Sequence, residues 1–208
     1  MKRVFAMVVF AQVFALGAAH ALADDHESSP QSAAEQLAGG LCAACHGANG
    51  MSMVPSQPHL AGQHAAYIAK QLANFKSGAR QNAIMAGMAA ALSEEDMAAL
   101  GRHYAALPPP PPAGTNAELA KTGESIYRYG IASKGLPACS GCHAPNGAGI
   151  PDQYPRLAGQ FADYLYGQLR AFAAHERAND SNAMMRGISS RLSDTEMRAV
   201  AEYLAGLK

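Results

Sequence analysis

The sequence has no excess of charge of either sign, and beyond its first residues it has no long hydrophobic run. Its 16 lysine and arginine residues balance 16 aspartate and glutamate residues. No basic patch stands out, which argues against a nucleic-acid-binding protein. No later segment reaches the ~20 apolar residues that a membrane-spanning helix needs. No useful length of the chain alternates apolar and polar residues, so the sequence does not predict a sheet.

Cysteines are equally few, and all four lie in two copies of the pattern Cys-x-x-Cys-His, at positions 42–46 and 139–143. This pattern attaches a c-type haem, because two thiols one helical turn apart can add to its vinyl groups while the histidine binds iron. We expect two covalently attached haem c groups, held by Cys42, Cys45, Cys139 and Cys142, with His46 and His143 as axial iron ligands. Two disulfides or a redox dithiol are the alternatives, but neither explains a histidine after each pair.

The N-terminus has the features of an export signal. Lys2 and Arg3 precede an apolar stretch from Val4 to Gly17, and small residues flank a cleavage point near Ala23. We therefore predict a signal peptide at 1–23 and a periplasmic mature protein. An uncleaved membrane anchor is the alternative, and the apolar stretch is short for it.

The chain repeats itself. A shift of 97 positions takes Cys42 onto Cys139 and the segment 58–63 onto 155–160, and after a three-residue insertion the shift becomes 100. The repeat predicts two domains, 24–107 and 115–208, joined by a proline-rich linker at 108–114. A proline run is a semi-rigid spacer, although a simple connector would suit the sequence equally.

Each repeat is expected to be helical. Apolar positions in 67–75 and 164–172 follow the helical period. Ser93 and Ser193 are each followed three residues later by an acidic residue, which predicts a capping box at a helix start. Pro58 and Pro155 recur in loops whose carbonyls are candidates to fix the two axial histidines, and simple turns would explain them as well.

The sixth iron ligand can be chosen by comparing the repeats. Methionine sulfur favours ferrous iron and raises the reduction potential. Met85 and Met185 coincide under the 100-residue shift and have no other evident role, so we assign them as the second axial ligands. Met88 and Met184 are the alternative ligands, and a role of Met85 and Met185 in core packing alone is the other interpretation of the pair.

These features together resemble the dihaem cytochrome c4 family over essentially the whole mature chain. The resemblance rests on both Cys-x-x-Cys-His motifs, on Leu-Ala-Gly-Gln at 60–63 and 157–160, and on Met-x-Gly followed by Leu-Ser in each half. It implies an all-α fold of two tandem class I cytochrome c domains, each enclosing one covalently bound haem, related by pseudo-two-fold symmetry. The five consecutive prolines depart from the family pattern and leave the geometry between the domains open.

The resemblance also implies a function. It describes a periplasmic electron carrier, not an enzyme, that takes electrons from a quinol-oxidising cytochrome complex and delivers them to a terminal oxidase. Some relatives are attached to the membrane, so peripheral association is allowed, and we expect a monomer. Two alternatives remain: a dihaem peroxidase, which needs an open iron site, and a haem subunit of a larger respiratory dehydrogenase or reductase.

Overall fold

The structure, a computed structural model, describes residues 30–208. The predicted signal peptide at 1–23 lies outside them. Within 30–208 the chain is helical, and extended segments pair only at isolated bridges. No helix in this part of the chain has the length and apolar character needed to cross a bilayer. The all-α prediction is confirmed.

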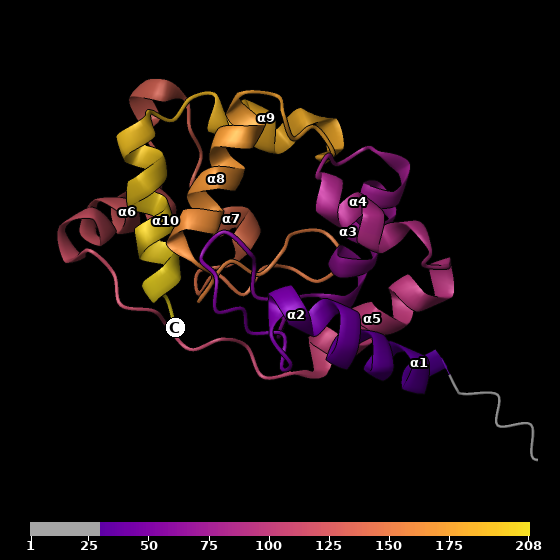
Figure 1. The fold of residues 1–208 in the computed structure, drawn as a ribbon. Coiled ribbons are helices and arrows are strands. Elements are labelled where there is room, and N and C mark those ends of the chain that lie inside the picture. The colour runs from indigo at the N-terminus through magenta and orange to yellow at the C-terminus, as the bar shows by residue number, and fades with distance from the viewer. Residues whose placement is uncertain (1–29) are drawn as a thin grey trace, which may run out of the picture.

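The first group of helices precedes the proline-rich segment (Figure 1). It consists of α1 (Pro30–Leu37), the π-helix η1 (Ala38–Cys42), α2 (Ala43–His46), α3 (Ala65–Ser77), α4 (Ala83–Ala90) and α5 (Glu94–Ala106). Helix α5 packs across α1 and α3, and α4 lies against α3. Their apolar faces meet in one core that includes Ile68, Phe75, Leu100 and Tyr104.

The second group repeats this arrangement. It consists of α6 (Ala117–Tyr129), the 3₁₀ turn η2 (Ala132–Lys134), α7 (Ser140–His143), α8 (Ala162–Ala173), the 3₁₀ turn η3 (Ser181–Ala183), α9 (Met184–Ser189) and α10 (Asp194–Gly206). Helix α10 packs against α6 and α8, and α9 lies against α8. A separate core forms here around Tyr127, Leu165, Val200 and Leu204. The repeat seen in the sequence is therefore a repeat of tertiary structure.

Both predicted capping boxes are confirmed. The Asp96 backbone N–H donates to the Ser93 hydroxyl oxygen at 3.0 Å, and the Ser93 N–H donates to the Asp96 carboxylate at 2.8 Å. Ser193 and Glu196 make the same pair of contacts at the start of α10. Each box satisfies two backbone groups that a helix start leaves free, so α5 and α10 begin at equivalent positions.

The two halves differ in how the chain enters its Cys-x-x-Cys-His motif. In the first half α1 continues through η1 directly into α2. In the second half α6 ends at Gly130, whose φ is 69°, and a loop leads to α7. A Cβ at Gly130 would lie 2.1 Å from the Leu136 carbonyl oxygen, so glycine permits this tight turn.

Two arginines form the centre of the contact between the halves. Arg80 donates hydrogen bonds to Gln71 of its own half (2.9 Å) and to Tyr164 (3.0 Å) and Gln168 (2.9 Å) of the other. Arg177 makes the reciprocal set, to Gln168 (2.8 Å), Tyr67 (2.9 Å) and Gln71 (3.1 Å). The two arginines also pair through an isolated antiparallel bridge. The contacts obey an approximate two-fold relation.

A second reciprocal pair involves the repeated Leu-Ala-Gly-Gln loops. The Gln63 side chain donates to the Arg156 carbonyl at 2.9 Å and accepts from the Arg156 N–H at 2.9 Å. Gln160 does the same with His59, at 2.9 Å and 3.0 Å. Each glutamine thus binds the loop before the equivalent glutamine in the other half. These buried amides hold the halves in one relative orientation.

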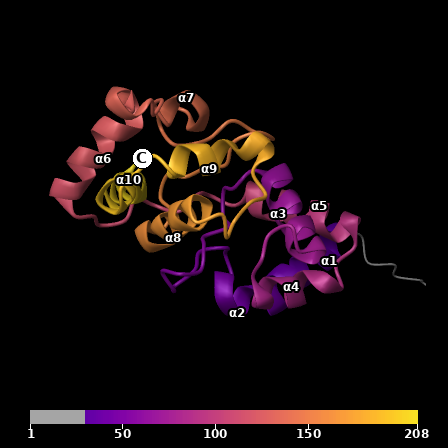
Figure 2. The same ribbon diagram turned by 90° about the horizontal axis from the view of Figure 1, so that it is seen from above.

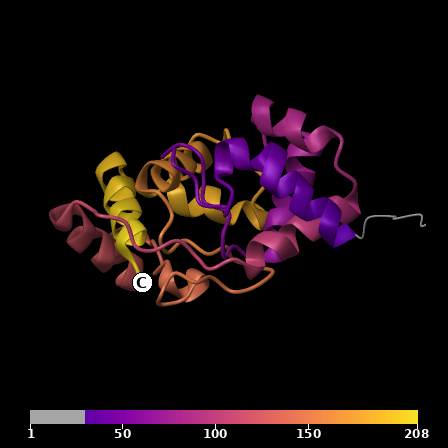
Figure 3. The same ribbon diagram turned by 60° about the horizontal axis from the view of Figure 1, so that its bottom comes forward.

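The proline-rich segment 108–114 runs along the junction (Figure 3). A Cβ added at Gly62 would lie 2.7 Å from Pro109, and one added at Gly159 would lie 2.7 Å from the Pro110 carbonyl oxygen. The linker is therefore packed against a loop of each half. Beyond the prolines, the Ala113 N–H donates to the Ala205 carbonyl at 2.8 Å.

Candidate haem-binding sites

The two Cys-x-x-Cys-His motifs lie on the short helices α2 and α7. In Figure 2, α2 and α4 lie near the bottom of the view and α7 and α9 in its upper part. All four thiols are free. Burial raises the pKa of the Cys42 thiol, against a smaller effect of a hydrogen bond from Tyr104, and raises that of Cys139 to about 11. The polypeptide therefore presents these two cysteines as thiols at neutral pH.

The two motif histidines are fixed through one ring nitrogen each. His46 Nδ1 lies 2.8 Å from the Pro58 carbonyl oxygen, and His143 Nδ1 lies 3.0 Å from the Pro155 carbonyl oxygen. A carbonyl only accepts, so Nδ1 must carry the proton and Nε2 keeps its lone pair for a metal. The role considered for Pro58 and Pro155 is confirmed.

Burial also keeps these imidazoles neutral. It lowers the pKa of both His46 and His143, and the hydrogen bonds to the proline carbonyls oppose this only in part. Neutral imidazole is the form that binds iron. The turn after each helix needs a positive φ, which Gly47 supplies at 76° and Ala144 at 63°.

A buried tyrosine lies beside each motif, and neither tyrosine was predicted from the sequence. The Tyr127 hydroxyl lies 3.2 Å from the His143 carbonyl oxygen and 2.5 Å from that of Ala144, at the end of α7. In the first half Tyr104 lies in the core against which Cys42 packs. Tyr127 projects from α6 and Tyr104 from α5, so the two are not equivalent in the repeat. Comparing the copies could not have found them.

The methionines assigned as second axial ligands lie on α4 and α9. Met85 packs against the first core, and the Asn82 side chain caps α4 by accepting from the Met85 N–H at 2.9 Å. Helix α9 is anchored by Asp180, which accepts from the Arg186 N–H at 2.9 Å and pairs with its guanidinium at 2.8 Å. Met185 is half-buried, whereas the alternatives Met88 and Met184 are exposed. The assignment of Met85 and Met185 stays a prediction.

The surroundings of the motifs fit an apolar cofactor. Large apolar side chains are exposed on the elements that carry the proposed ligands: Leu41 beside Cys42, Ile84 and Met88 on α4, and Met184 on α9. Exposed apolar side chains next to the proposed iron ligands indicate a surface that a bound cofactor would cover. Two thiols, one neutral imidazole and one thioether in each half match what a haem c requires.

No other donor cluster competes with these sites for iron. In the described part of the chain, no group of three or more histidine, cysteine, aspartate or glutamate side chains is placed to hold a metal ion.

Comparisons with known proteins agree with this geometry. The family model described as Cytochrome c matches residues 31–103 and 120–208. Cytochrome c4 of Thiocapsa roseopersicina is 47% identical over 190 residues, covering 90% of this chain and 97% of the relative. A thiosulfate dehydrogenase electron acceptor of Stutzerimonas stutzeri is 43% identical, covering 80% and 78%. The crystal structure of reduced recombinant cytochrome c4 from Pseudomonas stutzeri aligns with a TM-score of 0.80 at 37% identity, covering 85% of this chain and 98% of that one.

Proposed function

The chain belongs to the cytochrome c family as a dihaem electron carrier of the cytochrome c4 type, and we propose that it works in the periplasm between a quinol-oxidising cytochrome complex and a terminal oxidase. Two covalently attached haem c groups supply reversible one-electron Fe(III)/Fe(II) chemistry when bound. The observation that carries the proposal is the doubled arrangement of free thiols and carbonyl-oriented histidine in two halves held together by reciprocal contacts. We further propose the division into 24–107, 108–114 and 115–208, following cleavage near Ala23.

Each half contributes the same set of roles in this proposal. Cys42 and Cys45, or Cys139 and Cys142, hold the porphyrin through thioether bonds. His46 or His143 would bind iron through Nε2, while the carbonyl of Pro58 or Pro155 fixes the ring. Met85 or Met185 would supply a soft sulfur donor, which favours ferrous iron.

Visible spectroscopy of the purified holoprotein tests the ligand set and the non-enzymatic role. We expect two haems per chain, a methionine-to-ferric charge-transfer band, and no spectral change when carbon monoxide is added to the reduced protein. Rapid binding of carbon monoxide to a large fraction of the reduced haem would contradict the carrier and favour the dihaem peroxidase.

A second candidate function is supported by one comparison. A relative at 43% identity is a thiosulfate dehydrogenase electron acceptor, which favours the alternative of a haem subunit serving a larger dehydrogenase. Stopped-flow reduction distinguishes the two. A quinol-oxidising complex with its quinol should reduce the ferric protein faster than thiosulfate dehydrogenase with thiosulfate, and a terminal oxidase should reoxidise it. The opposite order of rates would assign the chain to thiosulfate oxidation.

A further inference from the structure

The first half has several methionine and histidine side chains without a counterpart in the second. Met51, Met53 and His59 are among them. The 97-residue shift places Ala148, Ile150 and Arg156 at those positions. The loss of all three donors together in the second copy separates them from the duplicated machinery of the two haem sites. A role for them must therefore be local to the first half.

The loop that carries the two methionines is held in a defined conformation. Ser52 is buried, and its hydroxyl donates to the Cys45 carbonyl at 3.0 Å while accepting from the Val54 N–H at 3.0 Å. Ser52 thus points inward, toward helix α2. Met51 and Met53 flank this anchored serine in the chain.

Both methionines and His59 line the same cavity, which has a volume of about 330 Å³. Its other walls include Pro110–Pro112 of the linker and Phe161. The Met53 side chain is 91% exposed, so its thioether is free to turn onto a bound ion. All three side chains therefore border one space at the junction of the halves.

His59 is held beside this cavity by ring stacking and by its backbone, not by hydrogen bonds of its ring nitrogens. Its imidazole stacks on Phe161 with ring centroids 4.1 Å apart, and its backbone is fixed on both sides by the Gln160 amide. Its Nδ1 is buried with no hydrogen-bond partner in the described part of the chain. A buried nitrogen is rarely left without a partner, so the ring has capacity for an additional ligand.

We propose that Met51, Met53 and His59 bind one Cu(I) ion. Two thioethers and an imidazole are soft donors, and soft donors select Cu(I) over the hard cations that prefer carboxylate oxygens. No carboxylate is found among the described residues that line the cavity, so its donor set does not suit Mg²⁺ or Ca²⁺. The site goes beyond the electron-carrier function and does not depend on it.

The binding test uses the fully reduced holoprotein under anaerobic conditions, which prevents electron exchange between copper and the haems. Cu(I) is supplied against a chromogenic Cu(I) chelator, and Ag(I) is titrated in parallel by calorimetry. We expect one ion per chain. The variants M51L, M53L and H59Q should each lower the affinity by at least about tenfold, because Leu and Gln remove a donor while largely preserving side-chain size.

The matched control is M97L, which removes a core methionine sulfur that does not line the cavity. It should retain the affinity of the parent protein, and X-ray absorption at the copper edge should show both sulfur and imidazole scattering. Visible spectra check that each variant keeps two haems. If M51L or H59Q loses haem, M53L decides alone, because this exposed side chain does not support the fold. Binding that is absent, or that has the same affinity in M53L and M97L, would overturn the proposal.

Discussion

At the scale of single residues, the proposed methionine ligands give the sharpest test of the haem sites. We expect M85A and M185A each to remove about half of the methionine-to-ferric band, to open one iron to carbon monoxide, and to lower the potential of that haem, because a soft sulfur donor is lost. Visible spectroscopy and potentiometric titration of the holoprotein measure these effects.

The control for this experiment is M97L. Met97 is buried at the start of α5, where it packs in the core, and a leucine of similar volume should cost less than about 1.5 kcal/mol. M97L should keep the full band. If M85A or M185A also keeps it, the ligand of that half is Met88 or Met184 instead.

The site residues were predictable from the sequence only where chemistry imposes a pattern. Cysteine and histidine spacing is dictated by the porphyrin, and the repeat brought out Pro58 and Pro155, whose carbonyls the structure places on the histidines. Tyr104 and Tyr127 could not be found in this way. Each lies beside its motif on a different helix, so their roles depend on tertiary packing that neither spacing nor repetition encodes.

At the scale of elements, one close helix crossing holds the second half together. Gly123 lies where α6 meets α10, and a Cβ there would be 1.9 Å from the Ala199 carbonyl oxygen. G123A should therefore force the helices apart and lower the free energy of unfolding by about 1–3 kcal/mol. Denaturant unfolding of the holoprotein, monitored by circular dichroism, measures the change.

G141A is the comparison for this substitution. A Cβ at Gly141 would meet nothing within 4 Å, and the equivalent position in the first motif is Ala44. We expect its stability to remain within about 0.5 kcal/mol of the parent. Equal losses in both variants would show that the helix crossing is not the sensitive feature.

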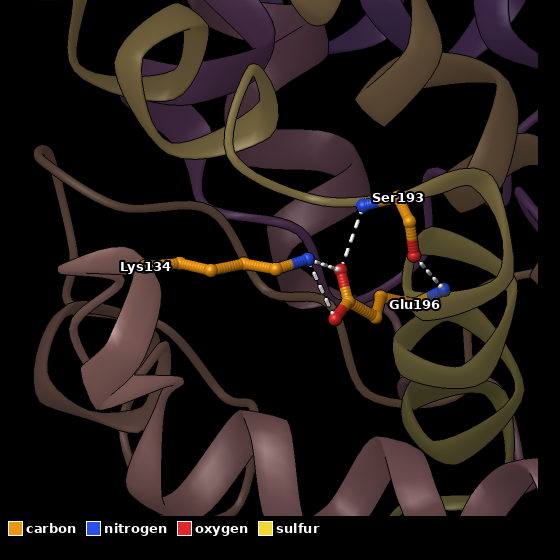
Figure 4. A network of polar contacts seen from close by, with 3 residues as sticks. All are labelled: Lys134, Ser193 and Glu196. Atoms are coloured by element: carbon orange, nitrogen blue, oxygen red, sulfur yellow. Dashed lines mark hydrogen bonds and ion pairs between the residues drawn. The ribbon is translucent and has the colours of Figure 1, made fainter.

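A second element-scale prediction concerns the contact that ties η2 to the start of α10 (Figure 4). Lys134 Nζ lies 2.6 Å and 2.8 Å from the two Glu196 carboxylate oxygens. The pair is partly exposed, so K134M should cost less than about 1 kcal/mol at neutral pH. K121M, at an exposed position of α6, is the control and should be neutral.

The loss of stability caused by K134M should become smaller as the pH falls. The pKa of Glu196 is lowered, and the hydrogen bond from Lys134 is the largest cause. The Glu196 carboxylate therefore takes up a proton less readily in the folded protein than in the unfolded chain. The stabilisation is therefore complete above the unfolded pKa and is lost as pH falls through the folded pKa. Unfolding free energies measured over an acid series should converge for parent and variant. A difference that grows as pH falls would contradict this assignment.

The helices themselves were largely predictable, and the entries to the haem motifs were not. Ser93 and Ser193 predicted the starts of α5 and α10 because capping is a local interaction. The π-helix before Cys42 and the loop after Gly130 differ although the motifs they lead into are alike. Their conformations depend on how α1 and α6 pack against the rest of each half, which local sequence does not report.

At the scale of the whole molecule, the two halves are joined mainly by polar side chains around Arg80 and Arg177. R80Q and R177Q should each lower the free energy of unfolding by about 1.5–3 kcal/mol, because hydrogen bonds from a charged group are lost. The double variant should cost less than the sum, since both arginines share Gln71 and Gln168 as acceptors. Denaturant unfolding gives the energies, and small-angle scattering reports any separation of the halves.

The exposed Arg102 on α5 provides the control for this cycle, and R102Q should leave both measurements unchanged. Strictly additive costs for R80Q and R177Q would mean that the two arginines act independently. The 97-residue shift takes Arg80 onto Arg177, so the repeat makes the two arginines equivalent. It could not predict that they meet, because the sequence does not say which surfaces of the two domains face one another.

The reciprocity of the Gln63 and Gln160 contacts has a consequence for assembly. Each half offers the same patch to the other, as in an isologous dimer, and such a contact is closed, so a third copy has no place to add. Here both partners lie on one polypeptide, joined by a short segment packed into their junction. The pairing is therefore unimolecular, and dilution cannot separate the two halves as it separates the subunits of an ordinary dimer.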